Sequence, residues 1–229
     1  MMKQLPILLL TLSTLFCFSQ KQYKFDYIIE YKLTFYKDSL AKKTISRYYF
    51  TNSKKNNYLA VITNLDSLNY QMDFKDENGI SFNVNFLKSD LNKAEFINVD
   101  CQYVNNYNNP FKDRIKKYDF FNLNDTIIDG TEYNRYKLTS IKLKKHKKKK
   151  LATEIYIVDK NTKFHLPIFY FPTAYEEWKS KKNIPSGIFK ERLLFDSYGN
   201  LSVKEELVSY HTINKTITID EKCDYTQNK

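Results

Sequence analysis

The stretch YKFDYIIEYKLTF, Tyr23 to Phe35, decides the fold class. Within it, an apolar or aromatic residue stands at every second position: Phe25, Tyr27, Ile29, Tyr31, Leu33 and Phe35. The positions between them are mostly polar: Lys24, Asp26, Glu30, Lys32 and Thr34. A period of two places alternate side chains on opposite faces of an extended chain. The stretch therefore predicts a long β-strand with one buried face.

The rest of the chain repeats this pattern. The tyrosine-rich segments 44–50 and 57–63 flank a polar turn. The alternating segments 68–74 and 80–86 predict a hairpin across the turn Asp76 to Gly79. Further strands are predicted over 94–104, 126–144, 151–158 and 164–171, with two or three more over 187–220. Pro167 confines the 164–171 strand to an edge or a bulge of the sheet.

Two short helices are predicted among these strands. Asn109 before Pro110 is a typical helix start, which indicates a short helix within 108–117. The segment 172–183, PTAYEEWKSKKN, is the stronger candidate because Tyr175 and Trp178 are three residues apart and share one helix face. The predicted fold class is mainly β: a curved antiparallel sheet or half-barrel of about ten strands cupping one short helix.

The first residues have the pattern of a secretory signal peptide. Lys3 precedes an apolar run from Leu5 to Phe18, shorter than the roughly 20 residues that a membrane-spanning helix needs. We expect cleavage after Ser19, so that residues 1–19 are a signal peptide and the mature chain has no transmembrane anchor. Phe16 before Cys17 argues against a lipoprotein signal. Residues 20–229 are then a single β-rich domain, exported to the periplasm or the extracellular space.

Two cysteines remain in the mature chain, Cys101 and Cys223. In an oxidising compartment they can pair as a disulfide that ties the C-terminal segment to the middle of the chain, and the alternative is two separate buried thiols. Both cysteines are isolated from the histidines in sequence. The sequence therefore predicts no metal site.

The sequence contains none of the local motifs of catalysis or cofactor binding. Its four glycines are isolated, which excludes a phosphate-binding loop and a dinucleotide fingerprint, so no cofactor is expected. The three histidines are scattered, and Glu176 and Glu177 are adjacent on the predicted helix and point to different faces. We therefore expect a protein that is not an enzyme. A less favoured alternative is an unrecognised hydrolase, because the two catalytic carboxylates of a glycosidase need not be close in sequence.

A lysine-rich run occupies residues 142–150, between the strands 126–144 and 151–158. Its first interpretation is the solvated tip of a hairpin. Its second is a contact with an anionic envelope surface through Lys144, Lys145, Lys147, Lys148, Lys149 and Lys150. Nucleic acid is not an expected partner, because the chain is exported and no aromatic residue for base stacking alternates with the lysines. Nothing in the sequence fixes the oligomeric state.

The segment 127–138, IIDGTEYNRYKL, is similar to a strand entry of the GLPGLI-type and LolA-like exported envelope proteins of Bacteroidetes. The segments 154–169 and 184–200 resemble the later half of these families. Tyr133 stands near a position where they often have a cysteine, and NIPSGIF at 183–189 replaces Gly-Leu-Pro-Gly-Leu-Ile. The resemblance implies a half-barrel that cups the helix containing PTAYEEW. LolA-like members use such a cup for lipid chains or lipoproteins.

The leading functional hypothesis is an exported, non-enzymatic envelope protein that binds a lipid or another apolar ligand in the concave face of its sheet. Tyr175 and Trp178 are the candidate ligand-binding residues. The alternative is a structural or interaction module with a filled core, which binds polysaccharide or protein through surface tyrosines. A cavity above about 300 Å³ would favour the first hypothesis.

Replacement of Lys147 to Lys150 with serine tests the interpretation as a solvated tip. We expect the melting temperature to stay nearly unchanged, because an exposed loop tip contributes little to stability. Thermal unfolding followed by circular dichroism measures this. A loss of several degrees would show that these lysines have a structural role.

Overall fold

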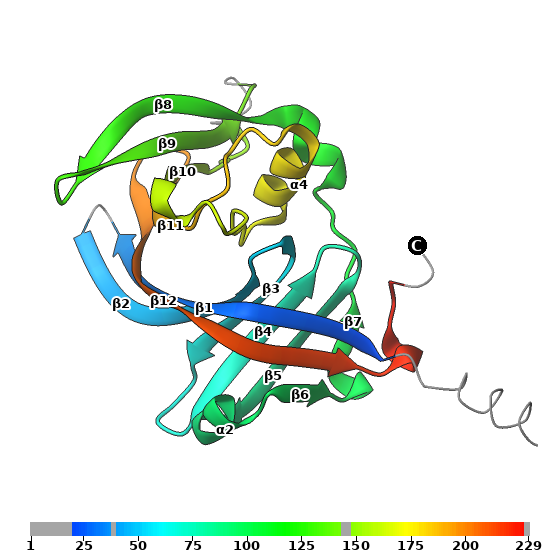
Figure 1. Cartoon of the computed structure of the whole chain (residues 1–229). Helices are drawn as coiled ribbons and strands as arrows, with labels where there is room; N and C mark the ends of the chain where they lie inside the picture. Colours follow the sequence, from blue (N-terminus) through cyan, green and yellow to red (C-terminus); the bar gives the residue numbers. More distant parts are fainter. Residues whose placement is uncertain (1–19, 38–39, 143–147, 227–229) are drawn as a thin grey trace, which may run out of the picture.

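The computed structural model describes residues 20–37, 40–142 and 148–226. The predicted signal peptide, residues 1–19, and residues 143–147 of the lysine run lie outside these ranges. Within the ranges, twelve strands form one strongly curved, open sheet (Figure 1). The predicted class, a mainly β protein with a curved antiparallel sheet, is confirmed.

The strand order along the sheet is β7-β5-β4-β3-β2-β1-β12-β11-β10-β9-β8, and β6 pairs with β12 beside this path. The strands of the first half are β1 (Lys21–Lys37), β2 (Leu40–Asn52), β3 (Lys55–Asn64), β4 (Asn69–Asp76), β5 (Ile80–Leu87), β6 (Phe96–Val99) and β7 (Val104–Asn106). Those of the second half are β8 (Tyr118–Ile128), β9 (Thr131–Ser140), β10 (Thr153–Val158), β11 (Phe189–Phe195) and β12 (Leu201–Ile219). All pairs are antiparallel except β6 with β12.

Short helices connect or follow the strands. Figure 1 labels two α-helices, α2 (Lys88–Lys93) and α4 (Pro172–Lys181). The 3₁₀ helices are η2 (Cys101–Tyr103), η3 (Lys112–Lys117), η4 (Lys160–Thr162) and η5 (Glu221–Cys223). None of the described helices is long and apolar enough to cross a membrane.

The first and last strands form the seam of the sheet. β1 pairs with β12 from Lys21, opposite Ile219, to Phe35, opposite Val203. β2 to β5 attach to β1, and β8 to β11 attach to β12, so each half of the sheet continues from one side of this seam (Figure 1). The two halves of the curve therefore depend on pairing between segments almost 200 residues apart in the chain.

The two faces of the sheet are both buried near the seam. In β3, Ala60 and Ile62 belong to one hydrophobic cluster, while Leu59 and Val61 between them belong to another. In β1, Phe25 belongs to the first cluster and Ile29 to the second. The register of β1 against β12 shifts between Phe25 and Tyr27, which moves the later side chains to the other face. The alternating stretch that predicts one buried face thus contributes to two cores.

The concave side of the sheet is covered by α4 and by the segment 164–171. Pro172 stands in the first turn of α4, and Lys182 ends the helix in the left-handed conformation, with its N–H donating to the Trp178 carbonyl (2.7 Å). The side chains of Tyr175 and Trp178 pack against β8 to β11. Figure 1 shows α4 inside the curve, next to these strands. The predicted helix and its placement in the cup are both present.

The segment 164–171 is not a strand, which corrects the prediction. Its polar backbone groups meet distant partners instead of a neighbouring strand: Leu166 N–H donates to the Ser53 carbonyl (2.9 Å), and the Pro167 carbonyl accepts from the Asn56 side chain (2.9 Å). Ile168 packs on the inner face of β1 to β3. The segment is therefore an irregular strap across the concave face.

Two further strand predictions were wrong in detail. The segment 94–104 is not one strand, because β6 pairs with β12 and β7 pairs with β5, and η2 lies between them where the chain changes neighbour. The segment 126–144 is divided by a tight turn at Asp129 and Gly130, both with positive φ, as hairpin turns of this kind require. β8 begins well before the predicted start, at Tyr118.

Cys101 of η2 and Cys223 of η5 form a disulfide in the structure, with 5.6 Å between their Cα atoms. The link joins residues 122 positions apart and connects the region beside β6 to the end of β12. In the chain-entropy account such a link stabilises the fold by restricting the unfolded chain.

Replacement of both Cys101 and Cys223 with serine is expected to lower the melting temperature by about 10 °C, because closing a loop of this length is worth on the order of 4 kcal/mol. Calorimetry of the double variant and of the oxidised wild type measures the difference. The single variant Cys101→Ser is the control and should fall equally far. Equal melting temperatures in all three proteins would contradict a stabilising link.

Candidate functional site

Two adjoining hollows remain between the concave face and the strap 164–171. Their volumes are about 330 Å³ and about 140 Å³. The larger is lined by Leu59, Val61, Asp73, Phe74, Lys75, Tyr170, Phe171 and Pro172. The smaller is lined by Leu33, Phe35, Arg47, Tyr170, Phe171, Arg192, Leu194, Val203 and Glu205. Because Tyr170 and Phe171 line both, we treat the two as one concave groove.

The larger hollow is the apolar end of the concave groove. Leu59 and Val61 come from the inner face of β3, and the end of the strap supplies aromatic rings. At its rim, Lys75 donates to the Tyr170 carbonyl (3.2 Å) and pairs with Glu77 (2.8 Å). The charged atom of this lysine is thus occupied by protein partners. The β3 side chains that line the hollow offer apolar contacts, and its charged lining residues, Asp73 and Lys75, both come from β4.

The smaller hollow contains a buried ionic cluster at the seam. Glu205 of β12 is 4% exposed, and its carboxylate accepts from Arg192 Nε (2.6 Å) and Tyr49 Oη (2.7 Å). Arg47 Nη1 lies 3.4 Å from the same carboxylate. Burial lowers the pKa of Arg192, but the carboxylate of Glu205 and nearby groups outweigh this and hold the pKa well above its ordinary value. Arg192 therefore remains charged.

Two donors of this cluster have no hydrogen-bond acceptor among the described residues. Arg47 Nε and Arg192 Nη1 are buried and make no hydrogen bond to any residue in 20–37, 40–142 or 148–226. Arg192 Nη1 lies 3.8 Å from a carboxylate oxygen of Glu154, which is within ion-pair range and too far for a hydrogen bond. Both guanidinium groups also lie over the Tyr170 ring, at 5.3 Å for Arg47 and 5.6 Å for Arg192. Buried donors without acceptors are uncommon in folded proteins.

The strap is attached beside the concave groove through His165. The ring is buried, and its Nδ1 lies 2.5 Å from the Leu166 carbonyl, while Nε2 lies 2.8 Å from Thr51 Oγ1. A carbonyl can only accept, so Nδ1 carries the proton and Nε2 accepts from the threonine hydroxyl. Burial lowers the pKa of His165, and the backbone hydrogen bond partly opposes this. His165 is therefore a neutral structural residue.

The buried glutamates of α4 also have structural partners. Asn109 donates from Nδ2 to both Glu77 and Glu176, at 2.9 Å each, which joins the turn after β4 to the helix. Glu177 pairs with Lys181 at 2.7 Å. The two adjacent glutamates thus face different partners, as the helical spacing predicts. The side-chain amide of Asn109 therefore connects Glu77, in the turn after β4, to Glu176 in α4.

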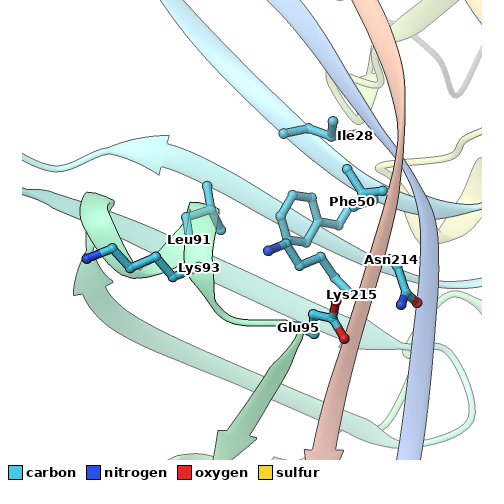
Figure 2. A pocket seen from close by; sticks show the side chains of 8 residues that line it. Ile28, Phe50, Leu91, Lys93, Glu95, Asn214 and Lys215 are labelled. Atoms are coloured by element: carbon cyan, nitrogen blue, oxygen red, sulfur yellow. The ribbon is translucent and has the colours of Figure 1, made fainter.

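A third hollow, of about 390 Å³, lies on the other side of the seam (Figure 2). Phe50, Leu91 and Ile213 supply apolar contacts, and Figure 2 shows Lys93 at the end of α2 and Glu95 on the connection to β6. Lys215 donates to the Ala94 carbonyl at 2.6 Å. This hollow occupies the place where β12 passes from pairing with β11 to pairing with β6. It is a gap in the sheet with exposed charges at its rim.

The predicted site residues are dispersed in the structure. Tyr175 and Trp178 are buried in the cluster under α4, where Trp178 Nε1 donates to the Ile184 carbonyl (3.0 Å). Lys148, Lys149 and Lys150 are exposed in the connection between the paired strands β9 and β10, and Lys144, Lys145 and Lys147 lie outside the described residues. Among the described residues, no group of three or more His, Cys, Asp or Glu could hold a metal ion.

Sequence reasoning missed Arg47, Arg192 and Glu205. A signal was present, because only four of the 37 basic residues are arginine, and Arg47 and Arg192 both lie in predicted strands rich in apolar or aromatic residues. In a chain that uses lysine almost everywhere else, an arginine within a buried strand indicates a need for its planar, fork-shaped group.

No protein-family model matches the sequence, and no curated protein matches it. The solved structures similar to the chain include Pseudomonas aeruginosa MucB in complex with MucA, with 8% identity over 82% of this chain and a TM-score of 0.43. A candidate outer membrane lipoprotein-sorting domain from Vibrio parahaemolyticus has 8% identity over 82% of this chain and 85% of its own, with a TM-score of 0.32. A DUF1329 family protein from Desulfovibrio piger has 11% identity over 90% of each chain, with a TM-score of 0.31. The chain spans about half (51%) of the MucB chain that it matches.

The lowered pKa of His165 predicts a stability that falls on acidification. The unfolded chain binds a proton near the ordinary pKa of 6.5, whereas the folded chain binds it only at lower pH, so stability is full above pH 6.5 and is lost below it. The melting temperature of His165→Gln should therefore depend less on pH between 7 and 5 than that of the wild type. His211→Gln, at an exposed position, is the control. The same slope in all three proteins would contradict this role.

Proposed function

We propose that the mature chain is an exported, non-enzymatic binding protein that holds the apolar chain of a lipid, or a similar apolar ligand, in the concave groove. The observation that carries the proposal is a pair of adjoining hollows lined mainly by apolar and aromatic side chains, the larger of about 330 Å³. Ligand pockets in proteins are usually concave and mostly apolar, and begin at about 300 Å³.

The position of the groove favours a binding role. The strap 164–171 crosses the concave face and is attached by hydrogen bonds to Ser53, in the turn between β2 and β3, and to the Asn56 side chain of β3, so it covers the hollows without filling them. The buried carboxylates near the groove each have a protein partner, such as Arg192 for Glu205 and Lys75 for Glu77. The proposal of a protein that is not an enzyme rests on these satisfied pairs and on the absence of local catalytic motifs in the sequence.

The proposed export and location of the protein rest on its sequence. The pattern of residues 1–19 supports secretion, which places the mature chain in the periplasm or outside the cell. The similarity of 127–138 to GLPGLI-type and LolA-like envelope proteins agrees with a lipid ligand. The exposed Lys148, Lys149 and Lys150 are suitably placed on the β9–β10 connection for contact with an anionic envelope surface.

A second candidate function rests on a surface aromatic cluster. Tyr27, Phe164 and Tyr210 lie within 6.5 Å of one another by ring centroid, and the last two are 39% and 38% exposed. Exposed rings of this kind can stack on a sugar ring or pack against a protein. Binding of polysaccharide or protein at this cluster is the alternative to the lipid function.

The substitution Val61→Phe tests the lipid function, because a larger side chain on β3 would fill the larger hollow. We expect the mature wild type to bind a fluorescent fatty acid and Val61→Phe to bind it at least about tenfold more weakly. Val208→Phe, the same change at an exposed position of β12, is the matched control and should bind normally. Fluorescence titration gives the Kd values, and thermal unfolding shows that both variants are folded. Wild-type affinity in Val61→Phe would contradict the groove as the site.

A further inference from the structure

The charged groups that line the smaller hollow are mostly positive. They are two guanidinium groups, of Arg47 and Arg192, and one carboxylate, of Glu205. Glu154 lies 3.8 Å from Arg192 Nη1 but does not line the hollow. A ligand in the hollow would therefore meet two guanidinium groups and one carboxylate. One negative charge on the ligand would balance the groups that line it.

The unpaired donors belong to these two arginines. Arg192 is only 7% exposed, yet its Nη1 makes no hydrogen bond within the described part of the chain, and the same holds for Nε of the partly buried Arg47. An unsatisfied buried N–H of a charged group is costly, so such groups usually have a partner in the functional state. Oxygen atoms of a carboxylate or a phosphodiester can accept from both arginines, and the planar guanidinium suits this geometry.

The arginines are also held in place. Tyr170 lies beneath both guanidinium groups, and Phe171 lies 5.2 Å from that of Arg192. The carboxylate of Glu205 accepts a hydrogen bond from Arg192 Nε, which also fixes the Arg192 side chain. Contacts on the ring and at the carboxylate restrict the side chains before a ligand arrives, which lowers the entropy cost of binding.

The apolar residues around the two arginines indicate which kind of molecule would carry the negative charge. Leu33, Phe35, Leu194 and Val203 line the same hollow, and Tyr170 and Phe171 continue into the larger one. A free inorganic anion would gain nothing from these walls. An amphiphile would place its anionic group at the arginines and its chain against the aliphatic and aromatic walls of the larger hollow.

We propose that the concave groove selects amphiphiles with one negative charge, a carboxylate or a phosphodiester at the end of an apolar chain, and that Arg47 and Arg192 bind this head group. The inference rests on the proposed function, and it adds the chemical class of the ligand and the residues that recognise it.

Binding of three probes separates the two parts of the claim. Oleate has a chain and an anionic head, oleyl alcohol has the same chain and a neutral head, and acetate has the anion alone. For the wild type we expect oleate to bind at least about tenfold more tightly than oleyl alcohol, since one hydrogen bond to a charged group is worth that much. Acetate at millimolar concentration should not compete with oleate.

The substitution Arg47→Met tests the arginine directly. Methionine keeps an apolar stem of similar length, and Glu205 retains Arg192 and Tyr49 as partners. We expect oleate affinity to fall at least about tenfold and oleyl alcohol affinity to stay unchanged. Arg47→Lys keeps the charge without the Nε donor. Its affinity for oleate should lie between those of the wild type and Arg47→Met. Arg135→Met, at an arginine of β9 that donates to the Asn124 carbonyl, is the matched control and should bind both probes normally.

Each of the other outcomes of these binding experiments would overturn a defined part of the proposal. Equal binding of oleate and oleyl alcohol, or an equal loss of both in folded Arg47→Met, would overturn the head-group assignment and leave the groove function standing. Acetate that binds as tightly as oleate would overturn the link between anion and chain. Failure of both oleate and oleyl alcohol to bind any of the folded proteins would overturn the proposed function together with this inference.

Discussion

The pairing of β1 with β12 is the constraint on which the rest of the structure depends. β1 is the first described strand along the chain and β12 the last, and their ladder runs from Lys21 opposite Ile219 to Phe35 opposite Val203. Each half of the sheet extends from one of these strands. Because the curve forms only when both halves meet at the seam, the concave face requires contacts of very long sequence separation, which form slowly in folding.

The ionic cluster lies on this seam and combines groups from three strands. Arg47 and Tyr49 come from β2, Arg192 from β11 and Glu205 from β12. A buried pair of this kind gains little net stability, because desolvation of the charges offsets their attraction. Two of its donors make no hydrogen bond to any residue that the structure describes, which is the observation behind the proposed ligand. The proposed binding site therefore lies at the seam of the sheet.

Local patterns predicted much of the fold, and long-range contacts explain the failures. Alternation between Phe25 and Phe35 depends only on neighbouring residues, so the strand was predictable, and Pro172 marked the start of α4. The strap was mistaken for a strand because its partners, such as Ser53, are more than 100 residues away. For the same reason the sequence did not connect Arg47 with Glu205, which is 158 residues further along the chain. Tyr175 and Trp178 were found as a helix face, but their apolar character serves the core.

Native mass spectrometry of the mature chain, purified gently from an envelope-containing host, tests the central claim most directly. The account predicts a protein with additional mass that organic extraction removes, and that mass should belong to a lipid or another amphiphile with an anionic head and an apolar chain. A bare protein mass, together with no uptake of added fatty acid, would contradict the account and favour an interaction module that uses the surface aromatic cluster of Tyr27, Phe164 and Tyr210.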